Sequence, residues 1–157
     1  MIKINVQNLN KKRRVRLRQV KALSSFVVKK VGKNKELKIN IVFLSDNEIK
    51  TMNKKFKNKN ITTDVLCFCM FEGSKLKGQD TDMGTDIYIS SDTAFREAKK
   101  YNMTYTSELY FYVVHGLLHM LGMDDSSEQL RAQMHKKQNE LIDEFYKKLS
   151  KKEKVKR

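Results

Sequence analysis

Hydrophobic and polar residues alternate in three short stretches of the chain, and each alternation predicts a β-strand. A fourth stretch, residues 63–69, is rich in residues that favour strands and predicts one as well. The stretch Leu37–Leu44 alternates at first and then becomes wholly apolar, which is typical of a strand that enters a core. The four predicted strands are residues 2–6, 37–44, 63–69 and 86–90.

Other segments carry apolar residues at helical spacing instead. In the first of them, apolar positions from Val15 to Val31 lead up to Gly32, which closes the predicted helix. Ser45 and Glu48 form a capping box that starts a short helix through about Phe56. Two more helices are expected over about 91–101 and 106–121.

A last helix is predicted to start at a second capping box, formed by Ser126 and Gln129. Its buried stripe is Leu130, Met134, Leu141, Phe145 and Leu149. The order of elements predicts an α+β (mixed α/β) fold: one domain over residues 1–150, with a small mixed sheet of about four strands and five or so helices. Residues 72–85 are expected to form a polar loop, and residues 151–157 a solvated basic tail.

Charge points to a polyanionic partner. The 157-residue chain has 33 lysines and arginines against 18 acids, a net charge of +15. This excess favours nucleic acid first and an anionic membrane surface second. A general lysine bias of the source proteome is the alternative. Six of the basic residues crowd into residues 11–18, which predicts an amphipathic helix with a basic leading turn.

The expected compartment is the cytoplasm, because the N-terminus lacks an apolar signal core and no stretch is long and apolar enough for a membrane span. Cys67 and Cys69 are the only cysteines. They are expected to be two buried thiols in a reducing compartment.

The segment His115-Gly-Leu-Leu-His-Met-Leu-Gly-Met-Asp-Asp125 carries the candidate chemistry. His115 and His119 share one face of a helix, Gly122 ends that helix, and Asp125 follows after the reversal. Ligands at i, i+4 and i+10 with glycine at i+7 match the metzincin zinc motif, here with aspartate as the third ligand. A packed histidine pair without metal is the alternative reading.

Gly116 stands where a metalloprotease has its glutamate base, so the pattern predicts a zinc site without protease chemistry. A small residue at this position also leaves room for another group to approach the metal closely. Asp124 could orient a ligand or accept a proton, or it could only precede the last helix. His135 is expected at the surface or its boundary.

Three blocks of the chain resemble the YbeY family of metal-dependent endoribonucleases, which act as rRNA maturation factors. Met52-Asn-Lys-Lys-Phe-Lys57 with Thr63-Asp-Val-Leu-Cys-Phe68 is similar to L-N-x-x-Y-R and P-T-D-V-L-S-F. Asp86-Ile-Tyr-Ile-Ser90 is similar to G-D-I-x-I-x, and the histidine segment to H-G-x-L-H-L-x-G-Y-D-H.

The resemblance implies a zinc site in an open cleft and a single-strand-preferring endoribonuclease. It also implies maturation of the 16S rRNA 3′ end, ribosome quality control, and RNA of the small ribosomal subunit as partner. No small-molecule cofactor is expected. On this basis His115, His119 and Asp125 are the metal ligands, and Lys57, His115 and His119 are the catalytic residues. Lys57 would stabilise charge on the phosphate. Phe68 and Tyr88 could stack a base, although strand aromatics more often pack in a core or cleft.

Two departures from the family pattern affect the chemistry. Asp125 replaces the third histidine, which lowers the charge of a zinc site and makes the metal a weaker Lewis acid, with a wider choice towards manganese. Lys57 replaces arginine and loses the bidentate fork. A ribosome-assembly or RNA-binding factor with a structural metal is therefore the second hypothesis. A hydrolase of peptides or small phosphoesters is the third, and Gly116 argues against the peptide case.

Overall fold

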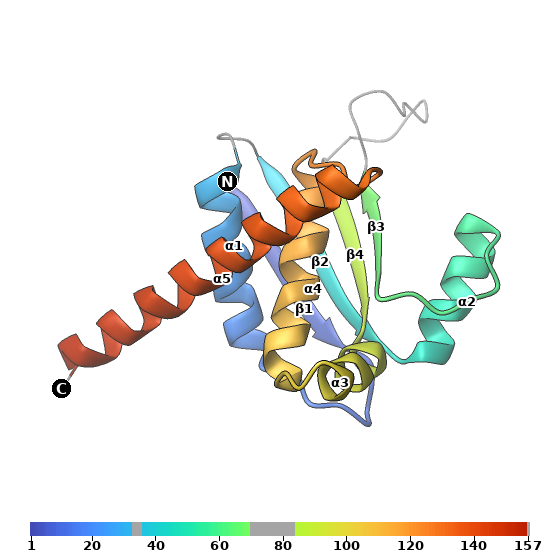
Figure 1. Ribbon diagram of the computed structural model, residues 1–157, viewed down its shortest axis with the longest axis horizontal. Helices are drawn as coiled ribbons and strands as arrows, with labels where there is room; N and C mark the ends of the chain where they lie inside the picture. The colour runs from blue at the N-terminus through green and yellow to red at the C-terminus, as the bar shows by residue number, and fades with distance from the viewer. Residues whose placement is uncertain (33–35, 70–83, 157) are drawn as a thin grey trace.

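The protein folds around one four-stranded mixed sheet in the order β1-β2-β4-β3. The computed structural model describes residues 1–32, 36–69 and 84–156. β1 (Ile2–Asn8), β2 (Leu37–Leu44) and β4 (Gly84–Ser90) are parallel, and β3 (Val65–Cys69) is an antiparallel edge strand beside β4. Figure 1 shows the sheet and the helices around it.

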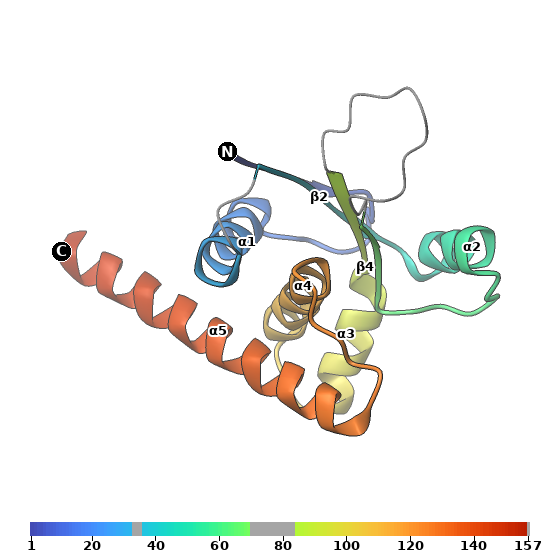
Figure 2. The same ribbon diagram turned by 90° about the horizontal axis from the view of Figure 1, so that it is seen from above.

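The helices are α1 (Leu17–Val31), α2 (Asp46–Lys57), α3 (Ser91–Lys100), α4 (Tyr105–Met120) and α5 (Glu128–Lys156). α1 and α4 cover one face of the sheet, and α5 lies across them on the outside (Figure 2). α2 stands on the opposite face. The α+β fold with about four strands and five helices is therefore confirmed.

Alternation along the strands explains the two faces. In β2, Ile39, Ile41 and Phe43 are fully buried in the large core under α1 and α4. The neighbouring Leu44 belongs to a smaller apolar cluster under α2, together with Ile49. Residues of one strand point alternately to opposite faces, so the same eight residues serve both cores.

Several predicted boundaries were wrong, each for a local reason. α1 begins at Leu17, so most of the basic run precedes the helix, in a turn bonded by asparagine side chains. α5 is capped by the hydroxyl of Ser127, which accepts from the Leu130 N–H, and not by a Ser126–Gln129 box. Ser126 Oγ instead donates to Asp124.

The predicted basic tail is helical, because α5 continues to Lys156 with its residues from Lys151 to Lys154 exposed. The Ser45–Glu48 capping box is confirmed. β4 begins at Gly84, two residues before the prediction, and most of the predicted polar loop lies outside the described residues. Among the described residues, no helix has the length and apolar character needed to cross a membrane.

Candidate metal centre

The helix α4 sets the spacing of the two candidate histidine ligands. Thr104 caps its N-terminus by accepting from the Ser107 N–H, and the helix then runs through the core without a break to Met120. His115 and His119 lie one turn apart near its end, with ring centroids 4.5 Å apart and planes at 80°. Their Nε2 atoms are separated by 3.0 Å.

A tight reversal returns the chain to these rings. Gly122 has φ of +97°, a conformation that L side chains rarely adopt. The N–H groups of Gly122 and Met123 bond to the carbonyls of His119 and Leu118. Asp125 then lies with Oδ2 3.2 Å from His119 Nε2 and 3.5 Å from His115 Nε2. The predicted convergence of the three groups is confirmed.

The three side chains fit a divalent metal ion. Their donor atoms all lie within 4.8 Å of one another. Donors about 2.1 Å from a tetrahedral ion lie ~3.4 Å apart, close to the separations observed here. Two imidazoles and one carboxylate are a ligand set that zinc accepts in hydrolases. All three are partly exposed, so the group opens to solvent.

Gln138 of α5 orients the buried side of His115. Its amide nitrogen donates to the carbonyl of Phe111 at 3.0 Å, which turns the amide oxygen towards His115 Nδ1 at 3.3 Å. Nδ1 therefore carries the proton, and the Nε2 lone pair faces His119 and Asp125. This is the outer hydrogen bond that metal-binding histidines commonly need. Gln138 is fully buried.

Sequence reasoning did not identify Gln138, although a signal was present. The residue falls between Met134 and Leu141 at the spacing of the buried stripe of α5, where an apolar side chain would be expected. A polar residue in such a stripe implies a buried partner.

Burial lowers the pKa of His115, although the hydrogen bond that its ring donates to Gln138 opposes this shift. The imidazole is thus neutral near pH 7, the form that binds a metal.

Glu108 and Tyr112 share the stripe of α4 that carries His115. Burial raises the pKa of the Glu108 carboxyl, and Tyr112 hydrogen-bonds to it. The negative charge of Asp64 also raises the pKa of both Glu108 and His115.

Gly116 serves packing and not access to the metal, which corrects the sequence interpretation. A Cβ on Gly116 would lie 2.7 Å from Ile87 Cγ2 and 3.3 Å from Val65 Cγ1. The glycine therefore allows α4 to approach β4 and β3 closely. Because Gly116 is next to His115, this close approach also sets the distance between the sheet and the part of α4 that carries the candidate ligands.

Lys57 lies on the other face of the sheet from the three candidate ligands. It ends α2, and its Nζ lies 5.5 Å from the ring centroid of Phe68. Phe68 belongs to the cluster under α2, whereas Val65 and Cys67 of the same strand pack in the core with α4. The edge strand β3 thus stands between Lys57 and His115, and the described contacts of Lys57 do not include a ligand.

The remaining candidates have structural neighbours. Both carboxylate oxygens of Asp124 accept from Ser126, which favours the structural interpretation. His135 is exposed, as predicted, with its ring 5.4 Å from that of Phe111.

Of the two cysteines, Cys67 is half-buried, with its thiol 3.9 Å from the carbonyl of Gly116, whereas the side chain of Cys69 lies outside the described part. Phe68 packs edge-on against Tyr88, 5.9 Å between centroids.

A small mixed sheet with a solvent-open His-His-Asp group at the end of a core helix defines a candidate metal-dependent hydrolase. Comparison with known proteins gives the family. Residues 5–146 match the family model described as Endoribonuclease YbeY. The chain belongs to the YbeY endoribonuclease family.

Individual relatives agree. The chain is 34% identical to the Syntrophus aciditrophicus endoribonuclease YbeY, over 88% of this chain and 87% of the relative. It is 31% identical to the Bacillus subtilis protein of the same name, over 82% and 85%. The solution structure of a Thermotoga maritima protein superposes with a TM-score of 0.63 at 26% identity, covering 97% of this chain and 93% of that one.

Proposed function

We propose that this protein is a zinc-dependent endoribonuclease that prefers single-stranded RNA. Its substrate is rRNA of the small ribosomal subunit, where it matures the 3′ end of 16S rRNA and takes part in ribosome quality control in the cytoplasm. The convergence of His115, His119 and Asp125 carries the proposal, since it supplies a three-donor site with a side open to solvent. Family membership supplies the reaction class.

Each residue has a separate task in this proposal. His115 and His119 hold the ion through Nε2, with His115 fixed by Gln138. Asp125 supplies the third donor and reduces the charge of the site. Zinc held by these groups would supply Lewis-acid chemistry at the scissile phosphate. The open side of the group faces solvent, so a phosphate can reach it without a rearrangement of the core.

Lys57 is proposed to stabilise negative charge on the bound phosphodiester. Its side chain is exposed at the end of α2, beyond the edge strand β3. An RNA strand laid across this edge would meet the metal group on one side and Lys57 on the other. Phe68 lies beside Lys57 and offers an aromatic ring to a base.

A non-catalytic ribosome-assembly factor with a structural metal is the second candidate. The observation that favours it is the position of Lys57, on the opposite face of the sheet from His115. The two functions differ in one test. If the protein is a nuclease, His115→Ala abolishes RNA cleavage while the variant stays folded and still binds RNA. Under the second function, the wild type does not cleave.

A further inference from the structure

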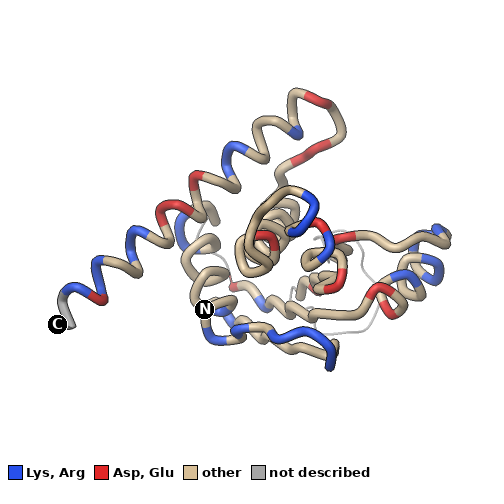
Figure 3. Tube along the Cα trace, turned by 60° about the horizontal axis from the view of Figure 1, so that its bottom comes forward, with Lys and Arg blue, Asp and Glu red and all other residues tan. Residues whose placement is uncertain are grey.

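A cavity of about 650 Å³ lies between the β1–α1 connection and the first half of α4. Ligand pockets commonly measure about 300–1,000 Å³, so its size suits a bound group. Four cationic side chains line it, and no acidic residue of the described ranges does. They are Lys11, Arg13, Arg14 and Arg16. Figure 3 marks this basic run in blue at the lower edge of the molecule.

Three of these charges are not paired with any acidic side chain that the structure describes. Arg13 bonds to Asp92 through Nε at 3.0 Å and stacks over the Phe95 ring. Lys11, Arg14 and Arg16 are exposed, and none of them forms an ion pair with any described acid. Uncompensated positive charges around a concave surface raise the local concentration of anions.

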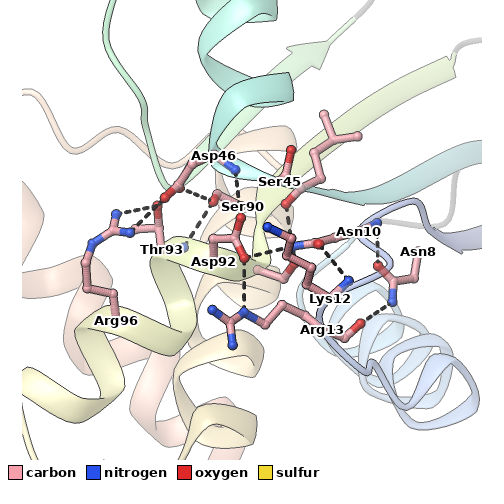
Figure 4. A network of polar contacts seen from close by, with 12 residues as sticks. Asn8, Asn10, Lys12, Arg13, Ser45, Asp46, Ser90, Asp92, Thr93 and Arg96 are labelled. Carbon is pink, nitrogen blue, oxygen red and sulfur yellow. Dashed lines mark hydrogen bonds and ion pairs between the residues drawn. The ribbon is translucent and has the colours of Figure 1, made fainter.

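The loop that carries these charges is held in place. Asn8 accepts from the Asn10 N–H and donates to the Arg13 carbonyl, at 3.0 and 2.7 Å. Asn10, itself buried, accepts from the Lys12 N–H and donates to Asp92 (Figure 4). A loop fixed by its own hydrogen bonds loses little entropy when a ligand binds, which favours affinity.

The start of α1 adds to the positive field at the cavity wall. Arg16 and Leu17, its N-cap and first residue, both line the cavity. Arg16 makes no side-chain cap, and the first turn holds no acidic residue. The positive end of the dipole of this 15-residue helix is therefore not compensated by a side chain of its own turn.

We propose that this cavity binds a phosphate of single-stranded RNA, away from the metal centre. The inference rests on the proposed function, because RNA is the polyanion on which the metal centre would act. Lys11, Arg14 and Arg16 contact the phosphate backbone, and the half-buried Tyr105 offers the exposed part of its ring to a base. A concave cavity with cationic walls suits a strand better than a flat membrane surface.

The cavity and the metal centre lie at opposite ends of α4. Cavity residues come from Tyr105–Tyr110, whereas the candidate ligands are His115 and His119. At about 1.5 Å per helical residue, the midpoints of these two segments are ~14 Å apart along the helix. The cavity therefore acts as an anchor for long RNA. It should raise affinity for long substrates without affecting the cleavage of very short ones.

The test is a triple variant, Lys11→Gln with Arg14→Gln and Arg16→Gln. Binding of a labelled single-stranded RNA longer than the span between the sites is measured by fluorescence anisotropy, with EDTA present so that nothing is cleaved. We expect affinity to fall by about tenfold or more at low salt. Three lost phosphate contacts should also make the slope of log K against log salt shallower by about 2.

The matched control removes three exposed lysines elsewhere, Lys21→Gln, Lys50→Gln and Lys147→Gln. It has the same net charge as the triple variant and should keep most of the affinity and slope. An equal loss in both variants would mean that the protein binds RNA through overall charge, and would overturn the proposal. Wild-type affinity in the triple variant would overturn it as well.

Two further measurements separate loss of charge from loss of folding. Arg14→Lys with Arg16→Lys, which keeps the charges, should retain binding, and thermal unfolding shows whether each variant is folded. Because binding is measured without metal, the cavity can be confirmed even if the wild type fails to cleave RNA. In active protein, the triple variant should raise KM for long RNA and leave the cleavage of a dinucleotide unchanged. An equal effect on both substrates contradicts the anchor.

Discussion

The Gln138 amide oxygen lies 3.3 Å from Nδ1 of His115, held there by the bond that its nitrogen donates to the main chain of α4. Two consecutive helices, α4 and α5, thus meet at one imidazole. The contact fixes which nitrogen of His115 can bind a metal, so α5 belongs to the metal centre although it supplies no ligand.

Gln138→Leu should lower metal affinity by about 10–100-fold, the usual effect of removing such an outer contact. Leucine fills a similar volume but offers His115 no acceptor. Competition with a chromogenic chelator measures the affinity, and circular dichroism checks the fold. Gln133→Leu, an exposed site on the same helix, is the control. Unchanged zinc affinity in Gln138→Leu would remove the proposed role.

Asp125→His should strengthen the Lewis acidity of the bound ion, because a neutral ligand replaces a charged one. We expect an increase in RNA cleavage on the order of tenfold, equal to ~1.4 kcal/mol of transition-state stabilisation. Zinc and manganese should both support RNA cleavage by the wild type, whereas the variant should prefer zinc. A cleavage rate at or below that of the wild type would show that the carboxylate does not reduce activity.

Lys57→Arg tests the proposed charge contact separately, since arginine restores a bidentate donor to a phosphate oxygen pair. A higher kcat with unchanged RNA affinity is the expected result in single-turnover cleavage. Lys55→Arg, a neighbouring exposed lysine of α2, is the control. If both substitutions behave alike, Lys57 acts only through its general charge.

Gly116→Ala should destabilise the protein by about 1–2 kcal/mol, because the new methyl group meets Ile87 and its cost exceeds the gain in helix propensity. Thermal unfolding should shift downwards by about 2–8 °C. Ile87→Ala removes the clashing methyl, so in a double-mutant cycle the cost of Gly116→Ala should shrink in that background. Additive effects would show that the two residues do not press on each other.

Acid should weaken the network around Asp46 at the end of β2. Burial alone would raise the Asp46 pKa, but hydrogen bonds from Arg96, Ser90 and Thr93 outweigh it and lower the pKa below its usual 3.8. The folded state therefore gains stability from this carboxylate above about pH 4, and loses it as pH falls through the lowered pKa. Figure 4 shows these partners.

Asp46→Asn should cost about 1–3 kcal/mol at pH 7 and flatten the acid side of the stability profile. Urea unfolding between neutral and acidic pH measures both effects. Asp143→Asn, at an exposed site of α5, should change neither by more than about 0.5 kcal/mol. Parallel pH profiles for wild type and Asp46→Asn would contradict the network.

The sequence predicted what depends on local periodicity. Alternation located the strands, and the spacing of His115, His119 and Asp125 predicted their convergence, because a helix and one reversal fix their positions. Lys57 could not be placed in this way. Its side of the sheet depends on which face α2 covers, and local periodicity does not specify that choice.

Close packing and hydrogen bonds between distant segments were also beyond local patterns. Next to His115 in the sequence, Gly116 predicts free space beside the metal, whereas the sheet occupies that space. Asn10 and Asp92, 82 residues apart, join the basic loop to the start of α3. Neither contact has a periodic signal, because each depends on how the elements pack.

The most direct test measures bound metal and RNA cleavage together. Purified wild-type protein is analysed for elemental content and assayed on single-stranded rRNA fragments beside His115→Ala. We predict about one zinc per wild-type chain with cleavage, and loss of both in His115→Ala while folding and RNA binding persist. Cleavage that survives in metal-free His115→Ala protein would contradict the assignment of the reaction to this group of three residues.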